Sequence, residues 1–346
     1  MTAAGAVEKS RFSIQEREED KMTRLKLYAG AAALALILGG PANAAQLNIA
    51  FTVHSATSNT FWQAVKKGFD DACAKIQANC QMIFTQTEGS IAEQSANMQT
   101  AVAANPDALI TSIVDNNAFT SILQDARSKG ILVIASNVDA TEGPAKKIRQ
   151  AFIGQGFIPA GYSLGMAQSK NFPKDGPIHV LVGVSAPGQN WSEQRAAGVM
   201  KFMEDFKKSN PGREVTVERI DSGTDLAVVS DRVGAYLSAH PDTTAYFDTG
   251  FWHAGVARVL ADRGVKPGKV LLGGFDLVPE VLEQMKAGYV QVQIDQQPYE
   301  QGFLPVMEVY LAKTVGLAPA DIDTGQGVVT PDQVDAIMAL SKQGVR

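Results

Sequence analysis

The sequence contains few of the residues that mark several special classes of protein. Its 346 residues include only two cysteines, and its formal net charge is -5. Two cysteines cannot supply a disulfide-rich scaffold, and a mildly acidic chain gives no electrostatic reason to bind nucleic acid. The 45% of hydrophobic residues excludes a disordered chain. Because the length exceeds the ~150 residues usual for one domain, a protein of two globular domains is favoured.

Long apolar runs are also missing, and the run Leu27–Leu38 is too short for a permanent membrane anchor. Its 12 residues would span roughly 18 Å as a helix, whereas the hydrocarbon core of a bilayer is ~30 Å thick. The basic residues Arg24 and Lys26 precede the run, and the small residues of Pro41–Ala44 follow it. This order is typical of a cleaved signal peptide. The sequence therefore predicts an exported protein.

We expect cleavage after Ala44, so that residues 1–44 form an N-terminal extension and signal peptide. The charged stretch Glu8–Lys21 does not fit the compact basic segment that begins such signals, and Met22 is a more sensible start. Whether residues 1–21 belong to the natural protein stays open.

Beyond Ala45 the chain alternates two periodicities. Short apolar runs typical of buried parallel strands occur at residues 47–53, 83–84, 108–113, 131–135, 178–184, 215–220, 245–247, 270–272 and 290–294. Apolar residues three and four positions apart predict helices at residues 91–102, 119–126, 226–237 and 303–311. Gly130, Gly264 and Gly288 each stand between a helix and a strand, where a left-handed residue is needed. Such repeated units predict α/β architecture with parallel sheets covered on both faces.

The segment Gln155–Gly161 interrupts the first series, and a second series begins at Ile178. The sequence thus predicts two α/β lobes. Ligands of open α/β sheets collect beyond the carboxyl ends of the strands, which directs attention to residues 54–62, 112–117, 136–139, 155–157, 185–195, 222–225, 249–253, 275–279 and 295–298. Most of these segments are rich in hydroxyl, amide, carboxylate or aromatic side chains. This composition suits a neutral ligand with many hydroxyl groups.

Motifs for catalysis or cofactor binding are absent. The first strand leads into Thr52–Ala56 without a glycine, and Gly154–Pro159 has proline where a dinucleotide-binding loop needs its third glycine. Gly183–Gly188 is one residue too long for a nucleophile elbow. His54 and His253 are interpreted as satisfied polar residues, so we expect no catalytic residue, metal site or cofactor. A secreted α/β hydrolase stays the enzyme alternative, because a fold alone does not exclude catalysis.

Cys73 and Cys80 are candidates for a disulfide, since an exported protein meets an oxidising environment. A continuous helix through both would hold them about 10 Å apart, too far for a bridge. A disulfide therefore requires the helix to end near Ala78, for which Asn79 is suitable. Bridged and free cysteines both stay open, and neither arrangement is a redox motif.

Five segments together resemble the ribose/galactose-type periplasmic sugar-binding proteins of ABC importers, in the type I periplasmic binding protein family. In chain order the segments are Ser58–Trp62, Val133–Asn137, Glu193–Arg195, Gly273–Asp276 and Ile294–Pro298. Each alone is a weak signal, whereas five in the family's order and spacing are specific. The resemblance extends from the cleavage site to about Val329.

This resemblance implies two similar doubly wound lobes joined by a hinge of three crossovers. The N-terminal lobe would hold residues 45–155 and 298–325, and the C-terminal lobe residues 156–297 and 326–346. A small sugar or polyol would be trapped by hinge closure and delivered by a periplasmic monomer to an inner-membrane ABC permease. A sensor that presents its ligand to a chemoreceptor or sensor kinase is the alternative, and it would use the same residues.

The resemblance also implies the roles of individual side chains. Asn59 looks like an amide that binds sugar hydroxyls, and Arg195 like a guanidinium that donates two hydrogen bonds, which lysine cannot reproduce. Asp276 resembles a carboxylate acceptor. The complete set of expected ligand-binding residues is Asn59, Phe61, Trp62, Asn137, Gln155, Arg195, Trp252, Asp276 and Gln296.

Three positions depart from the ribose-type pattern. This chain has Asn137 followed by valine where that pattern has aspartate and arginine, Thr224 where it has an aromatic ring, and Gly250 where it has asparagine. An unpaired buried donor or acceptor costs about 1–3 kcal/mol. The departures therefore argue against ribose and favour another pentose, a hexose or a sugar alcohol, with Trp252 and His253 as candidates for the replaced contacts.

Each expected role has a structural alternative. The ring pair of Phe61 and Trp62 could cover the start of a helix without touching a ligand. Asp276 could cap the following helix. Arg195 could face solvent and pair with Glu193 or Asp231, as exposed arginines usually do.

Overall fold

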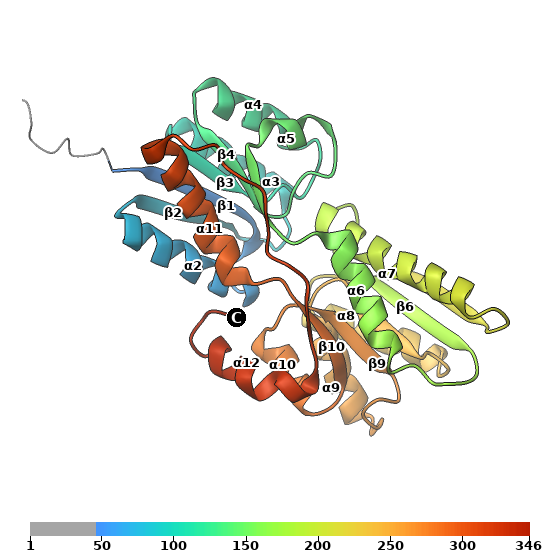
Figure 1. The fold of residues 1–346 in the computed structure, drawn as a ribbon. Helices are drawn as coiled ribbons and strands as arrows, with labels where there is room; N and C mark the ends of the chain where they lie inside the picture. Colours follow the sequence, from blue (N-terminus) through green and yellow to red (C-terminus); the bar gives the residue numbers. More distant parts are fainter. Residues whose placement is uncertain (1–45) are drawn as a thin grey trace, which may run out of the picture. The chain divides into compact units, whose positions relative to one another are not determined.

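The computed structural model describes residues 46–346. The predicted signal peptide and its cleavage site after Ala44 lie outside the described residues. The described chain contains two six-stranded sheets, and Figure 1 shows helices around both sheets. The two-lobed α/β fold expected from the sequence is thereby confirmed.

All but one of the strands of the first sheet come from the N-terminal half of the chain. Its strands are β1 (Asn48–Ala56), β2 (Asn79–Thr85), β3 (Ala108–Thr111), β4 (Leu132–Asn137), β5 (Ala151–Gly154) and β11 (Ile322–Asp323). Their order across the sheet is β11-β5-β4-β3-β1-β2, and all neighbours are parallel. The order reverses direction between β1 and β3, which makes the carboxyl ends of these two strands a crevice for a ligand.

The second sheet repeats this arrangement with one difference. Its strands are β6 (Ile178–Val184), β7 (Val215–Asp221), β8 (Ala245–Asp248), β9 (Leu271–Phe275), β10 (Val290–Asp295) and β12 (Gly327–Val329). Their order is β12-β10-β9-β8-β6-β7, with only β12 antiparallel to its neighbour. The corresponding crevice lies between β6 and β8.

Helices cover the sheets, and two pairs of them bring together distant parts of the chain. The helices are α2 (Phe61–Ile76), α3 (Ile91–Ala103), α4 (Thr120–Ser128), α5 (Gly143–Ile148), α6 (Phe157–Ser169), α7 (Asn190–Ser209), α8 (Leu226–Ala239), α9 (His253–Asp262), α10 (Pro279–Lys286), α11 (Pro298–Tyr310) and α12 (Val334–Ser341). Helix α11, near the C-terminus, packs along α2 on the first sheet, and α6 packs along α7 on the second (Figure 1).

Glycine allows both helix pairs to approach closely. A Cβ atom added at Gly302 of α11 would lie 1.9 Å from the Val65 carbonyl oxygen of α2. A Cβ atom at Gly198 of α7 would lie 2.3 Å from the Ile158 carbonyl oxygen of α6. Since a real side chain cannot approach a backbone oxygen so closely, glycine fixes the separation of the helices at both crossings.

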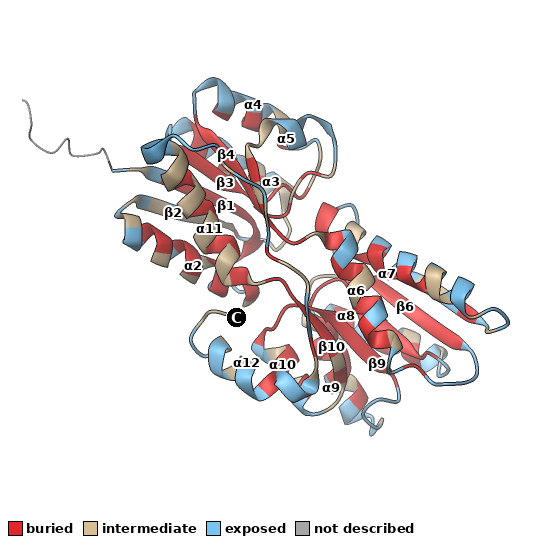
Figure 2. Cartoon of the chain, in the orientation of Figure 1, coloured by how far each residue is buried: buried red, intermediate tan, exposed pale blue. Residues whose placement is uncertain are grey.

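The hydrophobic core lies between strands and helices, as the buried strands and exposed outer helix faces in Figure 2 show. Every residue of β3, β4, β6, β8 and β9 is buried. Continuous apolar strands are expected where helices cover both faces of a parallel sheet. The edge strands β2 and β7 are only partly buried.

The nine expected strands all occur, but β5, β11 and β12 were not predicted. Strands β11 and β12 have only two and three residues, too few to show a periodicity, whereas β5 has four residues. The predicted left-handed glycines are confirmed, with φ angles of 78° at Gly130, 70° at Gly264 and 81° at Gly288. Most of the expected interruption at 155–161 is the first turn of α6, which begins at Phe157.

The chain passes between the sheets three times: after β5, after β10, and between β11 and β12. All three passages are short, since α6 begins at Phe157, α11 at Pro298 and β12 at Gly327. The lobe limits of 155/156, 297/298 and 325/326 given above stay a prediction at the level of single residues.

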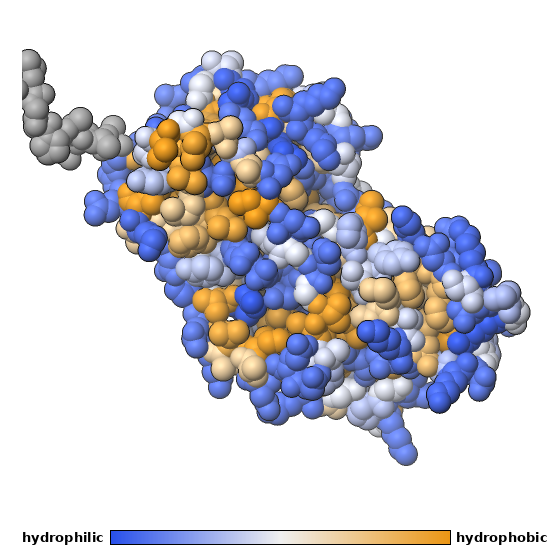
Figure 3. All heavy atoms as spheres, in the orientation of Figure 1, coloured by the Kyte–Doolittle hydropathy of each residue, from blue (hydrophilic) through white to orange (hydrophobic). Residues whose placement is uncertain are grey.

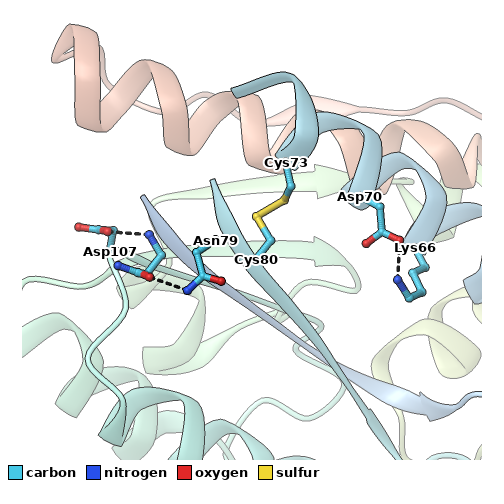
Figure 4. The surroundings of a disulfide bond; sticks show 7 residues. Lys66, Asp70, Cys73, Asn79, Cys80 and Asp107 are labelled. Carbon is cyan, nitrogen blue, oxygen red and sulfur yellow. Dashed lines mark hydrogen bonds and ion pairs between the residues drawn. A yellow bond between two sulfur atoms is a disulfide. The ribbon is translucent and has the colours of Figure 1, made fainter. Parts of the chain in front are cut away.

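A disulfide joins Cys73 of α2 to Cys80 of β2, with their Cα atoms 6.2 Å apart (Figure 4). Helix α2 ends at Ile76, and Gln77 follows in the left-handed conformation with φ 55°. The chain can therefore turn back and place Cys80 beside the helix. Next to the bridge, Asn79 Nδ2 donates to Asn48 Oδ1 at 2.8 Å.

The surface shown in Figure 3 mixes hydrophilic residues with separate groups of hydrophobic ones. Val315 and Leu317, beyond α11, are the most exposed of the large hydrophobic residues in the described chain, at 58% and 54%. Within residues 46–346, no helix has both the length and the apolar character that crossing a membrane requires.

Candidate functional site

A cavity lies where the carboxyl ends of the two sheets face each other, at the two crevices identified above. Its volume in this structure is about 40 Å³. The lining residues come from both lobes: His54, Asn59, Phe61, Trp62, Glu88, Asn137, Phe157, Trp191, Arg195, Gly250, Phe251, Trp252, Asp276 and Gln296.

Arg195, on α7, is the cationic group of the cavity and is only 3% exposed. Its Nη1 donates to the Thr249 carbonyl oxygen at 2.9 Å, and its Nη2 donates to Gln155 Oε1 at 3.2 Å. The guanidinium stacks over the Phe275 ring, 4.0 Å from its centroid. Among residues 46–346, the buried Nε atom has no hydrogen-bond partner. The protein therefore fixes the plane of the guanidinium and leaves its Nε–H available to a ligand.

Two carboxyl groups, the buried Asp276 and the partly buried Glu88, line the cavity with Arg195. Burial raises the pKa of Asp276, although the Arg195 charge opposes this rise. Burial also raises the pKa of Glu88, against the hydrogen bonds that it accepts. Burial lowers the pKa of Arg195 to about 10, a fall that Asp276 and Asp248 oppose. Arg195 therefore stays charged at neutral pH.

Glu88 is held by three donors of the first lobe. Its Oε2 accepts from Ser55 Oγ at 2.7 Å and from the Ala56 backbone N–H at 2.9 Å, and its Oε1 accepts from Asn59 Nδ2 at 3.0 Å. Asn59 Oδ1 in turn accepts from the Phe61 N–H at 3.1 Å. Asn59 thus positions Glu88 and the start of α2 while it lines the cavity.

His54 lines the cavity as a neutral imidazole. Burial and then the charge of Arg195 lower its pKa to about 3. His54 Nδ1 lies 2.9 Å from Ser112 Oγ. The expected satisfied histidine is thus confirmed at this position.

Aromatic rings from both lobes form apolar walls. Phe61 and Trp62 meet edge to face, with ring centroids 5.5 Å apart. On the second lobe, Phe251 and Trp252 are stacked at 4.6 Å, and Trp191 lies 6.2 Å from Trp252. The C–H groups of a sugar ring pack favourably against such faces.

Amide side chains connect the cavity to the crossovers between the lobes. Asn137 Nδ2 donates to Gln301 Oε1 at 2.8 Å and to Gln296 Oε1 at 3.3 Å, while Gln296 Nε2 donates to Asp276 Oδ1 at 2.6 Å. Gln155 Nε2 donates to the Gly325 carbonyl oxygen at 2.9 Å. A change in the relative position of the lobes would therefore alter the hydrogen bonds of Asp276 and Arg195.

The start of α7 contacts the first lobe outside the cavity. The Asn190 N–H donates to the Val114 carbonyl oxygen at 2.8 Å, and Asn190 Nδ2 donates to the carbonyl oxygens of Ile113 and Asp139. Gln189 Nε2 donates to the Gly89 carbonyl oxygen at 3.0 Å. These contacts hold the two lobes together over the ligand space.

The structure brings eight of the nine expected binding residues to the cavity: Asn59, Phe61, Trp62, Asn137, Arg195, Trp252, Asp276 and Gln296. Gln155, the ninth, contacts Arg195 instead of lining the same space. Glu88 and Trp191 were missed as binding residues, together with His54, Phe157, Gly250 and Phe251. Trp191 lies in a segment that the strand-end rule had marked, and Glu88 follows the end of β2, where the same rule applies.

Three alternatives from the sequence are wrong. Asp276 caps no helix, because α10 begins after Val278 and Asp276 has a left-handed backbone with φ 73°. Arg195 does not face solvent, and Glu193 pairs with Arg219 instead. His253 neither lines the cavity nor is satisfied: its nitrogens are buried without a hydrogen-bond partner among the described residues.

Comparison with protein families identifies the chain. Residues 49–314 match the family described as the periplasmic binding protein domain. The chain belongs to the periplasmic binding protein family. Membership implies a periplasmic location for this binding protein.

Among curated proteins, this periplasmic binding protein is similar to the xylose/arabinose-binding protein XylF of Sulfolobus acidocaldarius. The two are 27% identical over 304 residues, which cover 84% of this chain and 73% of the relative. A solute-binding protein of an ABC transporter from Burkholderia graminis, solved with D-arabinose, is 26% identical with a TM-score of 0.74, covering 83% and 96%. A carbohydrate transporter protein from Acidothermus cellulolyticus, solved with myo-inositol, is 26% identical with a TM-score of 0.72, covering 87% and 100%.

Proposed function

We propose that this periplasmic binding protein captures a small neutral sugar or polyol between its lobes and delivers it to an ABC permease. The observation that carries the proposal is the unpartnered Nε of Arg195, buried beside Asp276 in an aromatic-walled cavity. A hydroxyl group can accept from Nε and donate to a carboxylate, so adjacent sugar hydroxyls match this pair. The ligands named for the similar solved proteins, D-arabinose and myo-inositol, have this chemistry.

Each lobe supplies part of the ligand's contacts. Glu88 and the rings of Phe61 and Trp62 belong to the first lobe, whereas Arg195 and Asp276 belong to the second. A ligand bound to one lobe gains the other contacts only on closure, and these differential contacts stabilise the closed state. The contacts of Asn190 across the lobes add to the same closed state.

Binding without catalysis is part of the proposal. The residues that line the cavity include no serine, cysteine or lysine nucleophile of the kind an α/β hydrolase uses, and its two carboxyl groups, Glu88 and Asp276, accept hydrogen bonds within the site. We also propose cleavage of the export signal after Ala44, a monomeric state and the permease as partner. Delivery to a chemoreceptor or sensor kinase is the alternative, and it uses the same cavity.

The test is a thermal-shift screen of the mature protein with pentoses, hexoses, alditols and inositols, followed by calorimetric titration of each hit. A ligand that binds only the folded protein raises its melting temperature. Incubation with aryl glycosides in parallel tests the hydrolase alternative. The proposal fails if no sugar or polyol raises the melting temperature, or if glycosides are turned over.

Two variants test the site. Arg195→Lys keeps the charge but loses the planar fork, and Asp276→Asn loses the charged acceptor, so we expect each to weaken sugar binding by about tenfold or more. Arg219→Lys and Asp262→Asn are matched controls at exposed positions of the same lobe, and both should bind sugar as the parent does. Parent-like affinity in both site variants would contradict the proposed binding mode.

A further inference from the structure

A second group of polar side chains lies at the opposite end of the second sheet. His179 is the second residue of β6, Glu218 lies in the edge strand β7, and His240 follows the last residue of α8. His179 pairs with Thr216 in the parallel ladder. Because strand side chains alternate in direction, Glu218 shares a sheet face with Thr216 and hence with His179. The fold therefore gathers residues that are 39 and 22 positions apart.

The ligand atoms of these three residues converge. One nitrogen of each histidine and one oxygen of Glu218 lie within 4.8 Å of one another. Glu218 Oε1 is 3.1 Å from His179 Nε2. Small side-chain movements would bring the three atoms to the separations found around a tetrahedral metal ion, whose bonds to nitrogen and oxygen are about 2.0–2.2 Å.

A carboxylate faces each nitrogen of the His179 ring. Asp242 Oδ2 lies 3.3 Å from Nδ1, opposite the contact of Nε2 with Glu218. A neutral imidazole has one N–H and one lone pair, so it can donate to only one of them. If Nδ1–H donates to Asp242, the Nε2 lone pair can accept either from the Tyr236 hydroxyl, 2.9 Å away, or from a cation shared with Glu218. Metal-binding histidines commonly have such a carboxylate on the second nitrogen.

The position of His240 is fixed by packing. Its ring stacks on Tyr236 with centroids 4.2 Å apart and lies 5.7 Å from the His179 ring. The Tyr236 hydroxyl is 2.9 Å from His179 Nε2, so a bound cation would replace this hydrogen bond. His179 is buried, whereas Glu218 and His240 are partly exposed and leave a path for an ion.

We propose that His179, His240 and Glu218 bind a zinc-class divalent cation, with Asp242 orienting His179. Two imidazoles and one carboxylate suit zinc, and water can complete the tetrahedron. The ion would connect β6, β7 and the end of α8. Since this site lies toward the amino ends of the strands and the sugar cavity at their carboxyl ends, the proposal does not depend on sugar binding. It replaces the sequence-based expectation of no metal site.

The test is titration of the metal-free mature protein, prepared without a histidine tag, with ZnCl₂ against a competing chromophoric chelator. We expect one zinc ion per chain. His240→Gln and Glu218→Gln should each weaken zinc binding by about 100-fold, and Asp242→Asn by about tenfold, as expected for loss of an outer partner. Glu214→Gln, at an exposed position beside β7, is the matched control and should bind zinc as the parent does.

Two further measurements separate a specific site from weak surface binding. Co²⁺ should give the intense visible absorption of a four-coordinate ion in the parent, and His179→Ala should lose it. Zinc should raise the melting temperature of the parent but not of His240→Gln, while sugar affinity stays the same in both. Less than one zinc per chain, or parent-like zinc binding by both His240→Gln and Glu218→Gln, would overturn the proposal.

Discussion

The two lobes share one architecture, but each holds an edge strand in place with different side-chain contacts. Both sheets have the same strand order, and in both a helix pair meets at glycine. They differ where the edge strand must be held. In the first lobe the Cys73–Cys80 disulfide ties β2 to α2, whereas in the second lobe His179 contacts Glu218 of β7 and Tyr236 of α8. Because an edge strand has a neighbour on one side only, these side-chain contacts add to the single ladder of hydrogen bonds that holds β2 or β7.

The lobes also differ in what they offer a ligand. The first contributes an acceptor, Glu88, and the second contributes the cation Arg195 with its counterion Asp276. The amides of Asn137 and Gln296 join these halves at the crossovers. The two lobes thus share a strand order but contribute different charged groups, because the loops at their strand ends differ in sequence.

The largest expected effect tests the close helix packing at glycine that both lobes share. Gly302→Ala and Gly198→Ala should each destabilise the protein by about 3 kcal/mol, because the added methyl group overlaps a carbonyl oxygen of the paired helix. Gly234→Ala is the control, since its Cβ would meet its nearest neighbour at 3.4 Å, and it should be neutral or stabilising in a helix. Urea unfolding measures all three. A large loss of stability in only one of the two variants would show that the two helix crossings do not depend equally on glycine.

A smaller expected effect tests the difference between the side-chain contacts of the edge strands β2 and β7. Replacing both Cys73 and Cys80 by serine should lower the free energy of unfolding by about 2–3 kcal/mol, since the bridge limits the unfolded chain. Reducing agent should lower the stability of the parent by a similar amount and leave the variant unchanged. Sugar affinity should stay the same, because neither residue lines the cavity. An equal response of parent and variant to reductant would show that the disulfide does not stabilise the first lobe.

The smallest expected effect concerns the different charged groups that the two lobes contribute to the cavity. Burial raises the pKa of both Glu88 and Asp276, so these groups take up protons at higher pH than exposed carboxyl groups. Protonation removes a charged acceptor, and sugar affinity should therefore fall several-fold as the pH drops from 7 toward 4. His54 stays neutral over this range, since its pKa is about 3. Calorimetric titrations at several pH values measure the effect, which Glu88→Gln and Asp276→Asn should each reduce. Constant affinity over this range would contradict it.

The sequence predicted the elements with strong local patterns. Continuous apolar runs predicted nine of the twelve strands of the described chain, and glycine after a helix predicted the left-handed residues. Strands β11 and β12 carry no such signal, because they exist only through pairing with β5 and β10. Among site residues, the motifs around Arg195 and Asp276 were sufficient to find them. Glu88 was missed because it belongs to no motif and acquires its place from Asn59 and Ser55.

The residues alone determined that this chain would form two α/β lobes and where their strand ends would offer polar and aromatic groups, because periodicity and glycine placement act over short distances. Only the tertiary structure decided which of those groups share a cavity, that Arg195 is buried with a free donor, and that His179, Glu218 and His240 meet. These outcomes depend on contacts between residues far apart in the chain, which arise when sheets twist, helices pack and lobes close.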